Sequence, residues 1–487
     1  MTPLWKVTRR AVLSVRSDAT ILFCFEGDTA PEGLETATAE TVAAALARRA
    51  FRPGAGKTAL IEIGSGRGLK RLVVVGLGQR DAIDAELLHL AAAAGVQVAQ
   101  QIKAATIVAQ LPVTGLEQAC VEGLFVGLYR FDRYLSGKDA RAFRPQRLVF
   151  VTKEASVARR AAARAECVAE AMTTARDLVN EIPRVLNPVA YAKEIRTLFR
   201  GTGVSVKVFD HKQLRTMRMR SLLEVGVGSA VPPRVVHMVY KPPRRTRKRI
   251  ALIGKGVTFD AGGYNLKGTG NIEAMKGDMA GSAAVVGALL AAARLGVKAE
   301  VHGVVGLVEN LVSGKAYKPG DILHTRKGKT VEVNNTDAEG RLVLVDLLDY
   351  ASTTIKPSAM IDLATLTGAC VVALGTMASA AMGNDDALRK EIVAAAGRAG
   401  EKVWPMPLYK EYMEQLKSPI ADLHNTGGRW GGSITAGLFL QEFVGEGIPW
   451  VHLDIAGPAF FEKTHAFWGR GGTGAGVATL VEYLSGL

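Results

Sequence analysis

The sequence predicts an α/β protein with two domains, and three observations support this fold class. Short runs rich in β-branched residues alternate with alanine-rich stretches, as expected for mostly parallel sheets flanked by helices. The 487 residues exceed the size of one ordinary hydrophobic core. An alanine-rich stretch without proline or glycine separates the two alternating regions. We therefore expect a smaller N-terminal α/β domain over 1–154, a connecting helix over 155–180 and a larger C-terminal domain over 181–487, whose sheet is mixed but mostly parallel.

In the N-terminal region, six short runs have the composition of strands. They are Ala11–Val15, Ile21–Phe25, Ala59–Ile63, Arg71–Val75, Thr106–Ala109 and Leu148–Val151. Two alanine-rich stretches between them, Ala37–Arg49 and Ala85–Ile102, are predicted helices. No dense group of metal ligands or nucleophile partners occurs here, so the chemistry is expected in the second domain.

The connecting helix is predicted over Ala155–Asn180, which combines alanine with alternating charges. Pro183 and Pro188 follow it. Because proline cannot continue a helix, these two residues are expected to end it.

The C-terminal region again alternates strands with helices. Its predicted strands are Val204–Phe209, Val235–Tyr240, Ile250–Ile253, Val301–Val305, Met360–Leu363 and Trp450–Ile455. Met279–Leu295 and Leu342–Ala351 are predicted helices. Sites in open α/β sheets form beyond the carboxyl ends of strands, so polar residues that follow these strands are the functional candidates.

The densest group of charges is the octet Asn335-Thr336-Asp337-Ala338-Glu339-Gly340-Arg341-Leu342, directly before an apolar run. Such charges are costly to bury unless something compensates them. In an extended chain Asp337 and Glu339 point to one side, and Gly340 would let the backbone turn before the helix. Arg341 gains nothing from the helix dipole at that end, so we expect it to serve an anion.

A second charged group lies upstream, where Lys255 and Asp260 follow the predicted strand Ile250–Ile253 and Asp278 precedes a predicted helix. Together with the octet, this makes four carboxylates, which cannot all stay ionised without cations. Two divalent ions would resolve the repulsion, with some carboxylates bridging them. The pattern therefore indicates an oxygen-rich, two-metal hydrolytic site.

Each of these residues also has a structural interpretation. Asp278 is placed to cap the helix that follows it, and the other acids could form salt bridges. Lys255 and Lys267 could pair with the carboxylates, or a lysine could bind a metal as a neutral amine or hold an oxyanion. Spacing alone leaves the roles of the two lysines open.

Other hydrolytic designs lack their motifs in this sequence. There is no HExxH among the eight histidines, no G-x-S-x-G elbow and no Walker A sequence. His424, His452 and His465 are scattered along the chain and are interpreted as structural.

The formal net charge is +15, and its densest part is the segment Lys241–Arg249. Such a basic run can bind nucleic acid. It also contains two prolines and lies between two predicted strands, so a solvated hairpin loop is the preferred interpretation. DNA binding is retained as the alternative.

The sequence predicts a cytoplasmic protein without a membrane span. Four widely separated cysteines without a CxxC pair fit a reducing compartment. Residues 1–10 are basic but lack the apolar region of a signal peptide. The longest apolar run, Ala283–Val297, falls short of the roughly 20 residues that span a bilayer and is expected to be a buried helix.

Five ordered segments share the pattern of one known family. They are the octet 335–342, Gly254–Gly263, Glu273–Met279, Ser313–Asp321 and Ala364–Ala369. They resemble the M17 leucyl aminopeptidases, also called cytosol aminopeptidases, whereas the first domain resembles them only in size and α/β character. The resemblance implies a metal-dependent enzyme, in a homohexamer, that releases leucine and other residues from peptides with a free N-terminus.

The resemblance also implies a role for each site residue. The ligands of a tightly held ion, Zn²⁺ or Mn²⁺, would be Lys255, Asp260, Asp278 and Glu339. The ligands of a more exchangeable ion would be Asp260, Asp337 and Glu339. Lys267 would stabilise the oxyanion, and Arg341 would hold a bicarbonate that shuttles protons. The residues implied in substrate binding are Met275, Asn335, Thr365, Leu366 and Gly368.

The chain departs from the family pattern at two places, which bear on side-chain preference but remove no ligand. Gly268 follows Lys267 where many members have proline, and Asn425–Ser433 differs from the commonest version of that loop. The competing readings are a DNA-binding regulatory protein built on the peptidase fold and an inactive structural homologue. The intact ligand set argues against the second.

Overall fold

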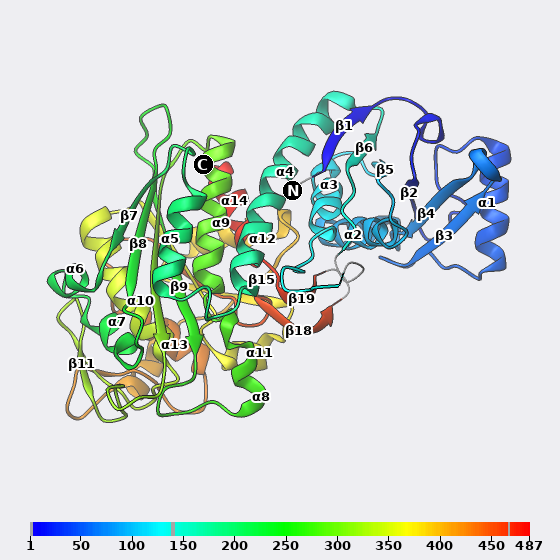
Figure 1. Cartoon of the computed structure of the whole chain (residues 1–487). Coiled ribbons are helices and arrows are strands. Elements are labelled where there is room, and N and C mark those ends of the chain that lie inside the picture. The colour runs from blue at the N-terminus through cyan, green and yellow to red at the C-terminus, as the bar shows by residue number, and fades with distance from the viewer. Residues whose placement is uncertain (1–2, 138–141, 466–467) are drawn as a thin grey trace. The chain divides into compact units, whose positions relative to one another are not determined.

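The computed structural model describes residues 3–137, 142–465 and 468–487. The chain divides into two compact units (Figure 1). Unit 1 comprises Met1–Thr173 with Thr464–Gly469, and unit 2 comprises Thr174–Lys463 with Arg470–Leu487. The division falls inside one helix, α4 (Ala155–Asn180), which spans the range predicted from the sequence.

Unit 1 contains a six-stranded sheet in the order β1-β6-β5-β2-β4-β3. The strands are β1 (Leu4–Thr8), β2 (Ala19–Cys24), β3 (Thr58–Ile63), β4 (Lys70–Gly76), β5 (Thr106–Gln110) and β6 (Arg147–Val151). All pairings are parallel except that of β3 with β4. The helices are α1 (Thr36–Arg48), α2 (Ala85–Gln101), α3 (Glu117–Gly127) and the short η1 (Val12–Ser14), η2 (Gly66–Gly68) and η3 (Arg80–Ala82).

At the edge of this sheet, one predicted strand is wrong. Ala11–Val15 is not a strand, because it contains the 3-10 helix η1, whose Val12 is buried. The edge strand is β1, which pairs in parallel with β6. The ring of Trp5 in β1 lies 6.3 Å from that of Phe150 in β6. Two apolar runs compete for this edge, and the choice depends on a partner strand about 140 residues away, which local composition does not reveal.

Unit 2 contains an eight-stranded sheet in the order β15-β14-β17-β13-β9-β10-β8-β7. Its strands are β7 (Ser205–Phe209), β8 (Arg234–Tyr240), β9 (Arg249–Asp260), β10 (Glu300–Asn310), β13 (Ala359–Ala364), β14 (Ala378–Gly383), β15 (Lys402–Pro405) and β17 (Trp450–Asp454). The neighbours β17, β13, β9 and β10 run parallel to one another. A three-stranded sheet consists of β11 (Ile322–His324), β12 (Thr330–Glu332) and β16 (Leu423–His424). A two-stranded sheet consists of β18 (Phe460–His465) and β19 (Gly469–Gly472), which both cross the boundary between the units.

The helices of unit 2 alternate with these strands, which confirms the predicted α/β class. They are α5 (Pro188–Leu198), α6 (His211–Thr216), α7 (Arg220–Val225), α8 (Thr269–Ile272), α9 (Ala280–Leu295), α10 (Glu339–Tyr350), α11 (Gly368–Leu374), α12 (Asp386–Arg398), α13 (Gly432–Gln441) and α14 (Val477–Ser485). The shorter helical segments are η4 (Gly226–Gly228), η5 (Glu273–Gly277), η6 (Ala351–Ile355) and η7 (Lys410–Leu416). Pro188, expected to end α4, instead begins α5, where its missing N–H is harmless.

Helices cover both faces of the large sheet (Figure 1). On one face, a side chain at Gly303 of β10 would meet Val285 of α9 at 3.1 Å. On the other, a side chain at Gly306 would meet Val343 of α10 at 2.9 Å. Glycine at these two positions therefore lets a helix approach each side of the strand.

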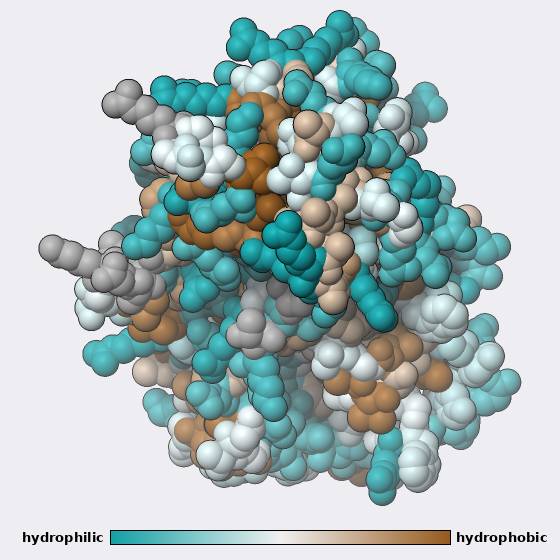
Figure 2. Space-filling model, turned by 90° about the vertical axis from the view of Figure 1, so that its right-hand side faces the viewer, coloured by the Kyte–Doolittle hydropathy of each residue, from teal (hydrophilic) through white to brown (hydrophobic). Residues whose placement is uncertain are grey.

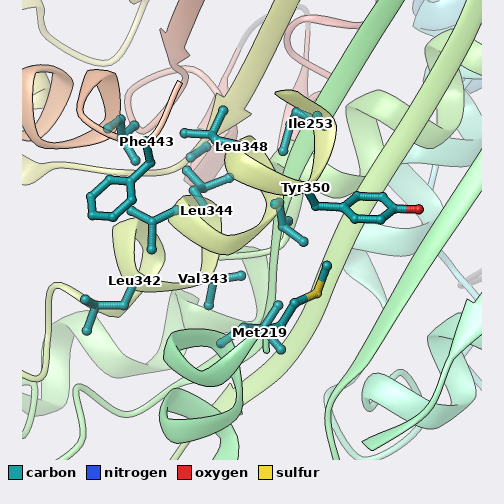
Figure 3. Packing of buried hydrophobic residues seen from close by; sticks show 14 of the residues in the cluster. Met219, Ile253, Leu342, Val343, Leu344, Leu348, Tyr350 and Phe443 are labelled. Atoms are coloured by element: carbon teal, nitrogen blue, oxygen red, sulfur yellow. The ribbon is translucent and has the colours of Figure 1, made fainter. Parts of the chain in front are cut away.

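A core of large aliphatic side chains lies between α10 and the sheet (Figure 3). Leu344 and Leu348 of α10 are fully buried there together with Ile253 of β9 and Phe443. This apolar packing holds α10, and with it the acidic residue Glu339 at its first position, against the centre of the sheet.

The segment Thr269–Leu295 is long and apolar enough, by length and composition alone, to cross a membrane. It ends in α9, and 78% of its most apolar window is buried inside the protein. That burial agrees with the predicted core helix.

Hydrophilic side chains cover most of the face drawn in Figure 2, with hydrophobic areas interspersed among them.

Asp346 is a fully buried carboxylate of α10 that joins three elements. Its Oδ2 accepts a hydrogen bond from the N–H of Leu222 in α7 at 3.0 Å. Its Oδ1 accepts one from the N–H of Arg326, between β11 and β12, at 2.8 Å. Burial raises the pKa of Asp346 to about 7, although both hydrogen bonds act in the opposite direction.

We expect this carboxyl group to make stability depend on pH. Because its folded pKa lies above the ordinary value of 3.8, the folded state holds the proton more tightly than the unfolded state. The resulting stabilisation is present in acid and is lost as the pH rises through about 7. As the pH rises from 3.8 to about 7, the free energy of unfolding of the wild type should fall by about 1–4 kcal/mol relative to that of Asp346→Asn. Urea unfolding at a series of pH values measures this, and parallel profiles for the two proteins would contradict it.

Candidate metal centre

The central parallel strands of unit 2 carry polar residues at their carboxyl ends. β9 ends at Asp260, β10 ends at Asn310 and β17 ends at Asp454, while Thr365 directly follows β13. These four strands are neighbours in the sheet. Because parallel strands end at the same edge, the sheet gathers these groups in one place, as expected for an α/β protein.

Lys255 and Asp260 lie within β9, which corrects the prediction that they follow a strand ending at Ile253. The strand continues through them because it stays paired with β10, and the pairing shifts by one residue at Thr258. A bulge of this kind changes the side that later residues face. It lets Lys255 and Asp260, five positions apart, reach the same site.

Lys255 is a buried ammonium group held between two carboxylates. Its Nζ lies 2.7 Å from Asp278 Oδ1 and 2.8 Å from Glu339 Oε1. It also donates to the carbonyl oxygen of Thr365 at 2.8 Å. Burial lowers the pKa of Lys255, but the charges of Asp278 and Glu339 outweigh it and raise the pKa above its ordinary value. The lysine therefore balances these two acids.

Lys267 forms a second bridge of the same kind. Its Nζ lies 2.8 Å from Asp260 Oδ2 and 2.6 Å from Asp337 Oδ1. One oxygen from each of Asp260, Asp337 and Glu339 lies within 4.8 Å of the other two. Burial, and then the charge of Glu339, raise the pKa of Asp260. The three acids thus form one compact group whose mutual repulsion the two lysines only partly relieve.

The donor atoms fit hard divalent cations. Asp278 Oδ2 and Glu339 Oε2 are buried and have no hydrogen-bond partner. Burial raises the pKa of Asp278 well above its ordinary value, although Lys255 acts against it. Carboxylate oxygens left unpaired in a buried site are unfavourable, and a cation at these atoms would remove that penalty. Carboxylate-rich sets of this type suit Mn²⁺, and Zn²⁺ also accepts carboxylate oxygens.

Asp278 does not cap the helix that follows it, contrary to its structural interpretation. α9 begins at Ala280, and its N-cap residue Met279 makes no capping bond through its side chain. The Oδ1 atom of Asp278 instead accepts a hydrogen bond from Thr365 Oγ1 at 2.7 Å. The carboxylate is therefore turned toward the end of β13 and toward Lys255.

The octet differs from its predicted geometry, because α10 begins at Glu339 rather than at Leu342. Asp337 precedes the helix and Glu339 opens it, so the two are not neighbours in an extended chain. Gly340 does not serve the turn that the sequence predicts. Its role is to avoid a clash, because a side chain there would lie 2.6 Å from Lys255 Nζ. The glycine lets the start of α10 approach β9 closely.

Arg341 is buried in the first turn of α10. Its Nη1 donates to the carbonyl oxygen of Asn425 at 2.8 Å. Burial lowers its pKa to about 10, while the charges of Glu339 and Asp454 act in the opposite direction. The Nε atom has no hydrogen-bond partner. Arg341 is thus a cation fixed beside the acids without an ion pair to any of them among the described residues.

Of the residues predicted to bind substrate, Asn335 and Met275 are close in sequence to the acids, and Thr365 donates a hydrogen bond to Asp278. Asn335 Oδ1 accepts a hydrogen bond from the N–H of Asp337 at 2.8 Å. The segment Thr365–Gly368 follows β13 and leads into α11. Met275 lies in η5, three residues before Asp278.

Several residues that hold the site were not predicted from the sequence. Asn310 Nδ2 donates to Asp260 Oδ1 at 2.8 Å and to the carbonyl oxygen of Thr336 at 3.0 Å. Tyr317 Oη donates to the same carbonyl at 2.9 Å. The family-like segment Ser313–Asp321 contains Tyr317 and was a usable signal, whereas nothing local marks Asn310.

The basic segment Lys241–Arg249 connects β8 to β9 and is largely exposed. It is not the hairpin loop that the sequence favours, because β10 lies between β8 and β9. It precedes β9, whereas Asp260 ends that strand. The basic segment and the acidic site therefore lie at opposite ends of β9.

The chain matches both domains of one family. The N-terminal domain of the cytosol aminopeptidase family matches residues 21–138, and the catalytic domain matches residues 173–481. The chain belongs to the cytosol aminopeptidase (M17) family. This confirms the resemblance carried by the five sequence segments, and it extends the family relationship to the N-terminal region.

Individual members of the cytosol aminopeptidase family align over most of the chain. A protein of Aquifex aeolicus described as "Probable cytosol aminopeptidase" is 43% identical over 84% of each chain. One of Picosynechococcus with the same description is 42% identical over 96% of each chain.

Solved structures agree with this membership. The bottromycin maturation enzyme BotP in complex with Mn has a TM-score of 0.87 and 37% identity, covering 97% of this chain and 99% of that one. A tomato leucine aminopeptidase mutant has a TM-score of 0.90 and 32% identity, covering 100% and 97%. The chain is therefore an M17-type aminopeptidase in fold and family.

Gly340→Ala should disturb the site while leaving the fold intact. The new methyl group would lie 2.6 Å from Nζ and Cε of Lys255, so the lysine must move away from Asp278 and Glu339. Alanine favours a helix over glycine by about 0.5–1 kcal/mol, so the melting temperature should not fall sharply. We expect kcat/KM for leucyl peptides to drop at least about tenfold, the equivalent of 1.4 kcal/mol.

The matched control is Gly397→Ala in α12, where a side chain would meet no atom within 4 Å. It should keep full activity and melt at the same or a slightly higher temperature. Normal activity in Gly340→Ala would contradict the close packing of α10 against Lys255.

Proposed function

We propose that this chain is a two-metal aminopeptidase that releases leucine and other N-terminal residues from peptides with a free N-terminus. The observation that carries the proposal is the convergence of Asp260, Asp337 and Glu339 within 4.8 Å of one another. The unpartnered oxygens of Asp278 and Glu339 support it, because they leave buried negative charge for a cation to satisfy. Membership of the M17 family supports the reaction class.

Five residues would hold the two ions, for which we infer Mn²⁺ or Zn²⁺. The ligands of the tightly held ion would be Lys255, Asp260, Asp278 and Glu339. The ligands of the exchangeable ion would be Asp260, Asp337 and Glu339. Two such ions, when bound, acidify a shared water near neutral pH and polarise the scissile carbonyl. The structural relative BotP, solved in complex with Mn, supports the choice of metal.

The chain's own cations complete the chemistry. Lys267 holds a positive charge between Asp260 and Asp337, which suits it to stabilise the oxyanion of a tetrahedral intermediate. Arg341 is buried, and the charge of Glu339 acts on its pKa. Because it makes no ion pair among the described residues, its guanidinium can bind an anion. We infer that bicarbonate occupies that position and moves the proton, as a general base would.

The segments next to these ligands would bind the substrate. Thr365–Gly368 is fixed at its start, where the Thr365 carbonyl accepts from Lys255 and its hydroxyl donates to Asp278. Asn335 is held by Asn425, whose Nδ2 donates to its carbonyl oxygen at 2.7 Å. We infer that these segments, with Met275, shape the pocket for the first side chain of the peptide. We also infer a cytoplasmic location, which the description of the relatives as cytosol aminopeptidases supports.

The metal assignment predicts a graded loss of bound ions. Asp337→Ala removes a ligand of only the exchangeable ion, so metal analysis should fall from two ions per chain toward one. Glu339→Ala removes a ligand that both ions share, so it should reduce both. Release of the N-terminal residue from Leu-Gly-type peptides, with added Zn²⁺ or Mn²⁺, should fall at least about a hundredfold in each variant.

The matched control is Asp386→Ala, which removes an exposed carboxylate whose ion pair, among the described residues, is with Arg389 on the surface of α12. It should retain both ions and full activity. Activity that persists in the Asp337→Ala, Glu339→Ala double variant, or under thorough chelation, would refute the proposal.

A further inference from the structure

Arg341 and His452 are two buried side chains that each leave one nitrogen without a hydrogen-bond partner. The atoms are Nε of Arg341 and Nε2 of His452. Arg341 is 6% exposed and His452 is 0% exposed. Unsatisfied polar atoms this deep in a protein are rare and normally signal a bound group or an ordered water.

His452 is fixed from one side by a carboxylate. Its Nδ1 lies 2.6 Å from Asp362 Oδ1, on the neighbouring strand β13. The other oxygen of Asp362 accepts a hydrogen bond from Trp450 Nε1 at 2.6 Å. Because Nδ1 is bound to Asp362, the free Nε2 points away from that carboxylate. The arrangement orients the imidazole, yet nothing among the described residues uses its second nitrogen.

The free nitrogen belongs to the face of the sheet that α10 covers. Trp450, His452 and Asp454 alternate along β17 and so face one side. Trp450 belongs to the same buried cluster as Leu342 and Leu344 of α10, whose first turn carries Arg341. Burial lowers the pKa of His452, Asp362 raises it above its ordinary value, and the charges of Asp454 and Arg341 act on it in opposite directions. The side chain of His452 and the helix that carries Arg341 therefore lie on the same side of the sheet.

We propose that one ordered water joins Nε of Arg341 to Nε2 of His452, so that Asp362 and His452 position the guanidinium of Arg341. A water oxygen accepts from the Nε–H of arginine, and the same water can donate to or accept from the imidazole nitrogen. The bridge therefore works in either protonation state of His452. His452 is then a positioning residue, not the isolated structural histidine that the sequence indicates.

The bridge would give Arg341 a second fixed point. Its Nη1 already donates to the carbonyl oxygen of Asn425 at 2.8 Å. Bonds at both Nη1 and Nε define the plane of the guanidinium and aim its remaining donors at one docking position. This step rests on the proposed function, because the anion inferred at that position is bicarbonate.

A crystal structure of the full-length, metal-loaded protein, at a resolution that shows ordered waters, tests the bridge without reference to activity. We expect density for one water about 2.7–3.2 Å from both nitrogens. Empty density between them, or a direct bond from Arg341 Nε to another acceptor such as Asp454, would overturn the proposal.

Bicarbonate kinetics test the positioning role. His452→Phe keeps an aromatic ring but removes both ring nitrogens, including the Nδ1 that contacts Asp362, and should raise the half-saturating bicarbonate concentration at least about tenfold, the effect of one hydrogen bond. His452→Gln keeps a polar atom and should restore most of the wild-type response. Arg341→Lys lacks Nε, so adding His452→Phe to that variant should have no further effect. Equal effects of His452→Phe in both backgrounds would show a merely structural role and overturn the inference.

The proposed function and the water bridge can be refuted separately. A wild-type protein that releases no N-terminal residue, or is not stimulated by bicarbonate, refutes the proposed function, and the crystal structure still decides whether the water is present. If His452→Phe does not fold, the crystal structure and the His452→Gln variant decide the question.

Discussion

Four carboxylates and two lysines share one buried site, and neither set of charges would be stable there without the other. Lys255 lies 2.7 Å from Asp278, and Lys267 lies 2.6 Å from Asp337. Removing a single ion from water costs several kcal/mol, so each of these groups depends on its partners being held in place. The fold of unit 2 can be understood as the means of bringing these charges together at one edge of a sheet.

Backbone features, more than the charged residues themselves, achieve this convergence. The shift in pairing at Thr258 brings Asp260 to the side of Lys255. Gly340 leaves room for Lys255 beside the first turn of α10, and the apolar core under that helix keeps Glu339 in position. The glycine and the core packing therefore bear on the chemistry as directly as the ligands do.

The same ion pairs affect how the site would bind metal. The two lysines keep the acids gathered, so little rearrangement of the backbone is required for a divalent ion to enter. They also occupy carboxylate oxygens that an ion would need, so binding must displace an ammonium group or deprotonate it. Arg341 stands apart, since its bond to Asn425 leaves it free of the acids and available to an anion.

The sequence by itself determined the α/β class, the range of α4, the family and the identity of the candidate ligands. These follow from composition, periodicity and short motifs, which are local properties. Only the tertiary structure decided that β9 continues through Asp260, that α10 begins at Glu339, and that Asp278 bonds Thr365 instead of capping a helix. The same holds for Asn310, Asn425 and the pair of Asp362 and His452. These contacts join residues that lie about 50–90 positions apart, and strand pairing and packing, which no local pattern encodes, bring them together.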